Sequence, residues 1–191
     1  VLAALVVVAA LGGCARPPTA APVVLSHPDR ADAHVEYYVE RPAGNGPWPT
    51  VVFLHGHQEG TDRIGGRAYA DWGVLRQFAD RGYLAVAVSL PGYGGSSGPA
   101  DFAGPFTQRA VAAVIETLAA ERDAAPDCIV IQGVSLGALT AALLAAEDQR
   151  IAGLVLIAGL YDLPAFFADP KTAGARSVKA AIDRQTGGSH E

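Results

Sequence analysis

Short apolar runs alternate with segments of helical periodicity between about residue 34 and residue 159, and this alternation restricts the fold more than any other feature of the chain. Runs such as VVFL and LAVAV are apolar at every position, which is typical of strands buried on both faces. Strands of this kind that alternate with helices form a largely parallel sheet with helices on both sides. The sequence therefore predicts an α/β protein, a three-layer α/β/α sandwich with a mostly parallel sheet.

The same pattern predicts where the chemistry lies. Right-handed crossovers bring the C-terminal ends of parallel strands, and the loops after them, to one edge of the sheet. The loops that begin at His55, Pro91 and Gly133 should therefore lie together. After residue 159 we expect a loop and a helix that lead out of the domain. Strands are expected at 34–40, 50–56, 83–90, 128–132 and 151–159, and helices at 68–81, 106–122 and 137–147.

The composition restricts the class of protein and of partner. Half of the 191 residues are apolar, which is enough for one domain with a substantial core. The formal net charge is −5, and the lysines and arginines form no cluster. The sequence therefore argues against nucleic acid as a partner.

The stretch GVSLG, residues 133–137, places one serine between two glycines, after an expected strand and before an expected helix. In a sharp strand-to-helix turn the glycines avoid collisions with neighbouring backbone, and the central serine projects its hydroxyl above the sheet. The N-terminus of the following helix stabilises negative charge at the same place. Ser135 is therefore a candidate nucleophile; the alternative is a small residue at an ordinary strand–helix turn.

Three motifs in this order resemble the first half of an α/β-hydrolase domain: VVFLHGH (51–57), SLPGYGGSSG (89–98) and GVSLG. The resemblance extends from about Val35 to Gly159. Residues 71–99 and 106–119 are most similar to secreted esterases of the dienelactone-hydrolase type and to the catalytic domains of prolyl-oligopeptidase-type serine peptidases. The resemblance implies a serine hydrolase that acts on a small-molecule ester or on a peptide and needs no cofactor.

The resemblance also implies roles for individual residues. Ser135 would be the catalytic nucleophile, and the backbone N–H groups of His57 and Leu136 would form the oxyanion hole. His55 would order the loop through hydrogen bonds of its ring. The spacing of His55 and His57 also resembles the start of a metal-binding H-x-H-x-D-H signature, but Gln58, Glu59 and Gly60 break that signature, so no metal site is expected.

A serine nucleophile needs a base and an orienting acid, and in this family they follow the serine in the chain. His190 is the only histidine after Ser135, and no strand that would precede an acid or a base is visible. We therefore expect a fragment of a longer hydrolase that lacks its C-terminal strands and its triad acid and base. Residues 14–191 alone are expected to be poorly soluble and to show little turnover.

A complete protein with an unusual triad is the alternative interpretation. Asp162 would then be the acid and His190 the base. Asp162 is equally suited to capping a turn, and Asp169, which precedes Pro170, has the features of a turn residue as well.

The N-terminal run VLAALVVVAALGGC suits the apolar part of a secretory signal and is too short to span a bilayer. Residues 11–14, LGGC, resemble the lipobox of bacterial lipoproteins, which implies lipid attachment at Cys14. We therefore expect a partial signal peptide at 1–13, a lipidated tether at 14–33 and a hydrolase domain at 34–191 that is incomplete at its C-terminus. The protein would be exported and membrane-anchored, in the bacterial periplasm or at the cell surface; an ordinary buried strand or helix is the alternative.

Three functions remain open from the sequence. A carboxylesterase-like enzyme is favoured over a prolyl-oligopeptidase-type peptidase, because only about 20 residues separate Cys14 from the first expected strand and those peptidases often carry a large N-terminal domain. The third is a non-catalytic lipoprotein that uses the fold for binding. Cys128 is expected to be a small buried core residue, and His27 and His34 are expected to be exposed without a partner.

Overall fold

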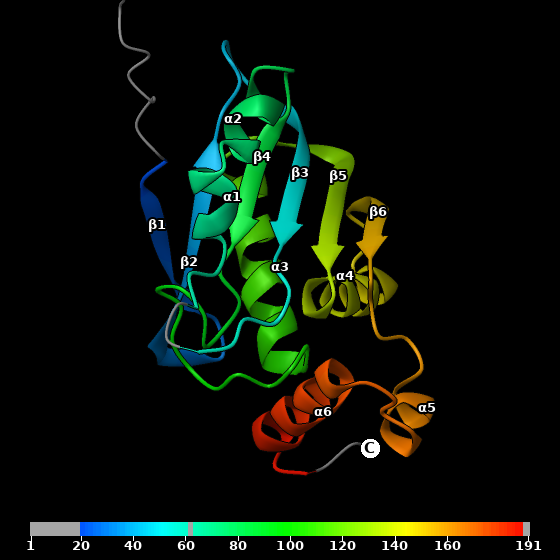
Figure 1. The fold of residues 1–191 in the computed structure, drawn as a ribbon. Helices are drawn as coiled ribbons and strands as arrows, with labels where there is room; N and C mark the ends of the chain where they lie inside the picture. The colour runs from blue at the N-terminus through cyan, green and yellow to red at the C-terminus, as the bar shows by residue number, and fades with distance from the viewer. Residues whose placement is uncertain (1–19, 61–62, 189–191) are drawn as a thin grey trace, which may run out of the picture.

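The computed structural model describes residues 20–60 and 63–188 (Figure 1). Residues 1–13, Cys14 and His190, on which predictions were made, lie outside the described residues. Within the described residues the chain forms a six-stranded sheet of order β1-β2-β4-β3-β5-β6. The sheet consists of β1 (Pro22–His27), β2 (Arg30–Glu40), β3 (Trp48–Leu54), β4 (Leu84–Val88), β5 (Ala124–Val134) and β6 (Ile151–Ile157).

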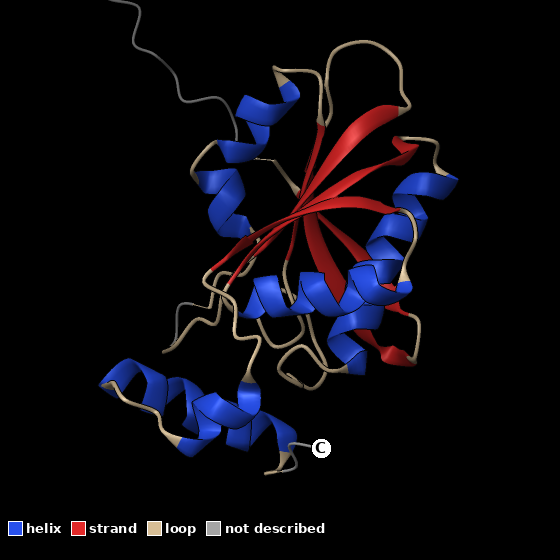
Figure 2. Cartoon of the chain, turned by 90° about the vertical axis from the view of Figure 1, so that its right-hand side faces the viewer, coloured by secondary structure: helices blue, strands red, loops and turns tan. Residues whose placement is uncertain are grey.

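The sheet is mixed but mostly parallel. Strands β4, β3, β5 and β6 pair in parallel, whereas β1 and β2 add an antiparallel hairpin next to β4. Helices lie on both of its faces, which makes three layers (Figure 2). The predicted α/β/α sandwich is thus confirmed. The helices are α1 (Arg67–Asp71), α2 (Val74–Ala79), α3 (Pro105–Ala120), α4 (Leu136–Glu147), α5 (Leu163–Ala168) and α6 (Ala173–Thr186).

The central strand β3 shows why its sequence is apolar throughout. Val52 and Leu54 belong to the core cluster that contains residues of α3 and α4. Val51 and Phe53 belong to a second cluster with residues of α1 and α2. Alternate side chains of a strand point to opposite faces, so a strand between two helical layers buries every side chain.

Two local predictions differ from the structure. The helix expected at 68–81 divides into α1 and α2 at Gly73, whose φ of 74° is left-handed and interrupts the helical hydrogen bonds. Residues 22–33, which the sequence analysis placed in the tether, form β1 and the start of β2. This hairpin was not predicted because its alternation of apolar and polar residues is short and is interrupted by the turn at 28–29.

The exposure of two further residues was predicted wrongly. Cys128 is exposed, because β5 begins with a register irregularity and Asp127 has a φ of 56°. His27 is only 2% exposed; its ring stacks on Phe106 at 3.6 Å, and its Nε2 lies 3.0 Å from the Phe106 carbonyl. His34 is exposed as expected, yet it has a partner, since Nδ1 lies 2.9 Å from Ser97 Oγ.

The prediction that the chain leaves the domain after residue 159 is also wrong. Helix α6 returns beneath the C-terminal ends of the parallel strands (Figure 1). Ala181 and Ile182 are 1% and 3% exposed, and Ile182 belongs to the main core cluster. The edge where the chemistry was expected is therefore partly covered by α6.

Strand β6 lies at the edge of the described sheet and is the least buried of the parallel strands. Leu154, Val155, Leu156 and Ile157 are 37–49% exposed. An apolar edge strand of this kind can pair with another strand. Among the described residues, no helix combines the length and the apolar character needed to cross a membrane.

Candidate active site

Ser135 lies at a strained turn between β5 and α4. Its φ of 51° and ψ of −110° fall in a region that residues other than glycine rarely adopt. A Cβ on Gly133 would lie 2.3 Å from the Gly137 carbonyl oxygen, and a Cβ on Gly137 would lie 2.3 Å from the Leu54 carbonyl oxygen. Only glycine fits at these two positions, as the sequence predicted for a tight strand-to-helix turn.

The backbone around Ser135 is held on both sides. Its N–H donates to the Ile157 carbonyl at 2.8 Å, and its carbonyl accepts from the N–H groups of Ala138 and Leu139. The side chain is half-buried, and within the described residues its hydroxyl forms no hydrogen bond. Leu136 is the first residue of α4, and the first N–H groups of a helix have no acceptor inside the helix. A helix N-terminus therefore adjoins a hydroxyl without a partner.

The loop after β3 lies directly against this turn. A Cβ on Gly56 would lie 3.3 Å from Ser135 Cβ and 3.3 Å from the Val134 carbonyl oxygen. The neighbouring His55 is buried, with Nδ1 2.7 Å from the Gly56 carbonyl and Nε2 3.1 Å from the Leu90 N–H. Because Leu90 donates to Nε2, the proton of the ring is on Nδ1 and is donated to Gly56. His55 thus orders the loop, as predicted.

The hydrogen bond to the Gly56 carbonyl also sets the direction of the next N–H group. The C=O and N–H of a planar trans peptide point in opposite directions. Because the Gly56 carbonyl points to the His55 ring, the N–H of His57 points away from it. The N–H of His57, which follows Gly56, and the N–H of Leu136, which follows Ser135, are candidates for an oxyanion hole; this assignment remains a prediction.

The His57 side chain is fixed by Tyr93, from the loop after β4. The Tyr93 hydroxyl lies 2.6 Å from His57 Nδ1. Burial raises the pKa of Tyr93, and interactions of its hydroxyl with the Gln185 side chain and the Gln58 backbone oppose that shift. His57 Nε2 is buried and lacks a hydrogen-bond partner among the described residues. One phenol therefore joins the loops after β3 and β4 to α6.

Glu36 anchors the loop that carries Tyr93. This buried carboxylate accepts from Ser89 Oγ at 2.8 Å and from the Gly95 N–H at 2.9 Å. Its own backbone N–H donates to Ser96 Oγ. Neither residue was predicted from the sequence. Tyr93 is the only aromatic residue in the glycine-rich loop 91–99, and this is a signal that could have indicated it, whereas Glu36 lies in an alternating strand and carries no such signal.

Helix α6 adds polar contacts to the same region. Ser177 Oγ donates to Glu59, and the Glu59 carboxylate lies 3.9 Å from His57 Nε2. Burial lowers the pKa of His57; Glu59 opposes this shift, and Arg63 and Arg184 add to it. The His57 ring is therefore neutral near pH 7.

The remaining acidic candidates are not brought to Ser135. Asp162 caps α5 by accepting from the Ala165 N–H at 3.0 Å, which confirms the capping alternative. Asp169 ends the same helix and pairs with Lys171 at 3.8 Å. Within residues 20–60 and 63–188 no carboxylate or imidazole is hydrogen-bonded to the Ser135 hydroxyl, and no three His, Cys, Asp or Glu side chains form a group that could hold a metal ion.

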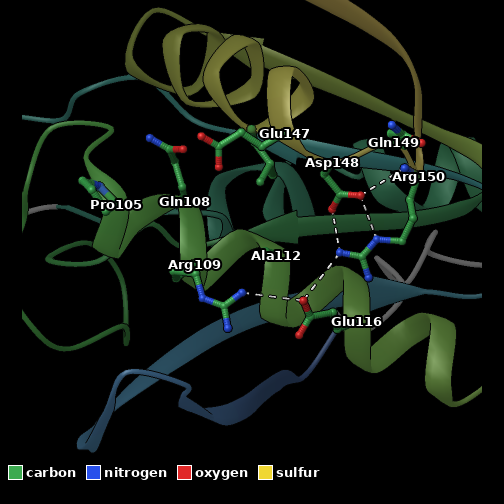
Figure 3. A pocket seen from close by; sticks show the side chains of 10 residues that line it. Pro105, Gln108, Arg109, Ala112, Glu116, Glu147, Asp148, Gln149 and Arg150 are labelled. Carbon is green, nitrogen blue, oxygen red and sulfur yellow. Dashed lines mark hydrogen bonds and ion pairs between the residues drawn. The ribbon is translucent and has the colours of Figure 1, made fainter.

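A surface cavity of about 600 Å³ lies elsewhere, between α3 and the C-terminal end of α4 (Figure 3). Arg150 binds Asp148 at 2.6 Å and Glu116 at 3.6 Å, and Arg109 lies 3.7 Å from Glu116. The two positive and two negative charges neutralise one another, and all except the largely buried Asp148 are partly exposed. The cavity lies at the other end of α4, which at 12 residues is about 18 Å long, so it does not belong to the Ser135 site.

The burial of His55 predicts that stability depends on pH. Burial lowers its pKa from 6.5 to about 4, although the hydrogen bond to Gly56 opposes the shift. Below pH 6.5 the unfolded chain binds a proton that the folded chain does not, so stability falls as the pH drops from 6.5 to about 4. We expect a loss of about 2–3 kcal/mol from this group between pH 7.5 and pH 4.5, measured by urea unfolding.

The variant His55→Gln removes the titrating ring and should show a correspondingly smaller fall between the two pH values. His34→Gln, at an exposed position, should keep the wild-type dependence. An equal pH dependence in the wild type and in His55→Gln would contradict the prediction.

The fold and the site define a class: an α/β protein with a strained serine at a tight strand-to-helix turn. The family model described as alpha/beta hydrolase fold matches residues 49–179. The chain belongs to the alpha/beta hydrolase fold family. No protein with a curated description matches the chain.

Solved structures of hydrolases resemble this one. Alpha/beta hydrolase GrgF from Penicillium sp. sh18 is 17% identical with a TM-score of 0.63, covering 86% of this chain and 53% of that one. Esterase Pf2001 from Pyrococcus furiosus is 19% identical with a TM-score of 0.63, covering 90% and 63%. The 2,6-dihydroxy-pseudo-oxynicotine hydrolase is 25% identical with a TM-score of 0.53, covering 69% and 34%. The chain thus spans between about a third and two thirds of these proteins.

Proposed function

We propose that this protein is a serine hydrolase that cleaves carboxylic esters through Ser135. The observation that carries the proposal is the strained backbone of Ser135, with φ of 51° and ψ of −110°, at the N-terminus of α4. Strain at a non-glycine residue is retained where the surrounding structure imposes it, and it gathers at functional sites. Here Gly133, Gly137 and the bond to Ile157 impose it.

The proposed reaction is acyl transfer. Ser135 Oγ forms a bond to the ester carbonyl carbon and gives its proton to a histidine base, which in this family follows the serine in the chain, and the carbonyl oxygen becomes negative. The N–H groups of His57 and Leu136 bind this oxygen; each such donor typically contributes about 3–4 kcal/mol to transition-state stabilisation. The C–O bond to the alcohol then breaks, the alcohol leaves with a proton, and water releases the acid from Ser135.

The substrate class is tested on the full-length protein by a panel of p-nitrophenyl esters against dipeptide nitroanilides. An esterase is favoured because an esterase is among the solved structures that resemble the chain. We expect faster turnover of the esters. Turnover of the nitroanilides at a higher kcat/KM would favour the prolyl-oligopeptidase-type peptidase instead.

A non-catalytic binding domain is the second candidate. It is favoured by one observation: no acid or base contacts the Ser135 hydroxyl within the described residues. Under this alternative neither substrate series is turned over and a fluorophosphonate probe does not label Ser135.

The location of the protein is a separate proposal that rests on the sequence of residues 1–14 alone. We propose export and membrane anchoring through a lipid on Cys14. Labelling with a fatty-acid analogue should appear in the wild type and disappear in Cys14→Ala. An exported wild type without label would contradict it.

Tyr93 is proposed as a positioning residue for the oxyanion hole. Tyr93→Phe removes the hydroxyl that holds His57, Gln58 and Gln185 together. Because a displacement of about 1 Å costs about 100-fold in rate, we expect kcat on a p-nitrophenyl ester to fall about 10- to 100-fold while KM stays within about twofold.

The control is Tyr83→Phe, at a side chain that is 40% exposed, which should retain the wild-type kcat. The unfolding midpoint in urea is measured for both variants. A kcat loss in Tyr93→Phe that is matched by the loss of folded protein would argue against a positioning role.

A further inference from the structure

A second cavity, of about 450 Å³, lies beside the candidate active site. One wall is α4, and the others come from the loop after β4 and from α5 and α6. Its lining is mainly apolar and includes Phe102, Leu139, Leu143, Leu163, Phe167 and Ile182. Its volume is in the range of small-molecule binding sites.

Ser135, Leu136 and His57 do not themselves line the cavity, but residues close to them do. Leu139 and Leu143 follow Ser135 by one and two helical turns on α4, about 6 Å and 12 Å along the axis. On the other side, the Phe102 ring lies 6.1 Å from the His57 ring. The space between these walls therefore extends along α4 away from Ser135.

Three of the four polar side chains of the lining are hydrogen-bonded within the protein, and the fourth, Tyr161, is 57% exposed. Asp101 accepts from the backbone N–H groups of Phe106 and Thr107 at the start of α3. The Gln108 amide donates to the Ala103 carbonyl, and the Thr186 hydroxyl donates to the Ile182 carbonyl. A polar ligand would thus lose hydrogen bonds with water that these groups do not replace, whereas an apolar ligand would not.

We propose that this cavity binds the apolar acyl chain of the ester substrate. The inference rests on the proposed function, because the carbonyl is placed at Ser135. An extended chain advances roughly 1.2 Å per bond, so it passes Leu139 after about five bonds and reaches Leu143 after about ten. The substrate class is therefore esters of medium-chain fatty acids, of about eight to ten carbons.

Binding of the free acids tests the cavity without turnover. Isothermal titration calorimetry is carried out with octanoate and with butanoate on the wild-type protein. Each buried methylene is worth about fourfold in affinity, so four additional methylenes give at most about 200-fold. We expect octanoate to bind at least about tenfold more tightly than butanoate.

The variant Leu143→Trp fills the far half of the cavity at a side chain that is 41% exposed. It should reduce the ratio of octanoate to butanoate affinity to near one. Leu143→Gln, which introduces a polar amide of similar length, should reduce the same ratio. It replaces Leu143→Trp in the test if the tryptophan variant fails to fold. Val24→Trp, on the exposed and distant β1, should keep the wild-type ratio.

Equal affinities of the two acids for the wild type, or an unchanged ratio in Leu143→Trp and Leu143→Gln, would overturn the assignment of the cavity. Fluorophosphonate labelling on the same preparations tests the proposed function separately. If octanoate is preferred and the preference depends on Leu143, the assignment of the cavity as a binding site for apolar chains is supported even where Ser135 is not labelled. In that case only the proposed hydrolysis through Ser135 is contradicted.

Discussion

Replacing Ser135 with alanine in the full-length protein is expected to abolish labelling by a fluorophosphonate probe and to lower kcat/KM for p-nitrophenyl esters by at least about 10³-fold. The reason is chemical, since alanine has no oxygen to attack the carbonyl. The loss should fall on kcat rather than on KM, because the donors at His57 and Leu136 belong to the backbone and remain. Labelling is measured by mass spectrometry and turnover by absorbance.

The matched control is Ser26→Ala, which removes another hydroxyl on the exposed strand β1. It should retain both labelling and turnover. Labelling that survives in Ser135→Ala would remove Ser135 as the nucleophile, and with it the proposed reaction.

Replacing Gly137 with alanine is expected to destabilise the protein by about 3 kcal/mol or more. The added Cβ would lie 2.3 Å from the Leu54 carbonyl oxygen and 2.8 Å from the His55 carbonyl oxygen. Both contacts are with backbone at the end of the central strand β3, which has little freedom to move. Helix α4 must therefore shift outward and take Ser135 with it. Urea unfolding measures the loss, and probe labelling should fall in parallel.

Gly174 provides the control, because it is the second residue of α6 as Gly137 is the second residue of α4. A Cβ on Gly174 would meet only Thr172 Oγ1, at 4.0 Å. Gly174→Ala should leave stability unchanged or raise it by up to about 1 kcal/mol. Similar effects of the two substitutions would mean that the close packing of α4 on β3 is not required.

The features that could be predicted from the sequence depend on neighbours in the chain. The runs that form β3 and β4 are apolar because helices cover both of their faces. The glycines around Ser135 are required by contacts within one turn and with the adjacent strand. Such constraints leave a local pattern, so the layers, most of the elements and the candidate nucleophile were predictable.

The rest depends on contacts between distant segments. Tyr93 and Gln185 interact although they are 92 positions apart in the chain, and no local pattern encodes that interaction. Helix α6 did carry a signal: Val178, Ala181 and Ile182 have the i, i+3, i+4 spacing of a helix with one buried face. That spacing indicates that the helix packs against something, but not that it returns to the site.

The hydrogen bond between the Ser135 N–H and the Ile157 carbonyl has a mechanical consequence. The most solvent-exposed of the parallel strands is also the one that tethers the backbone of the proposed nucleophile. A partner that binds along the outer edge of β6, or displaces this strand, would therefore shift the backbone that carries the reactive hydroxyl, because a single 2.8 Å hydrogen bond joins the two.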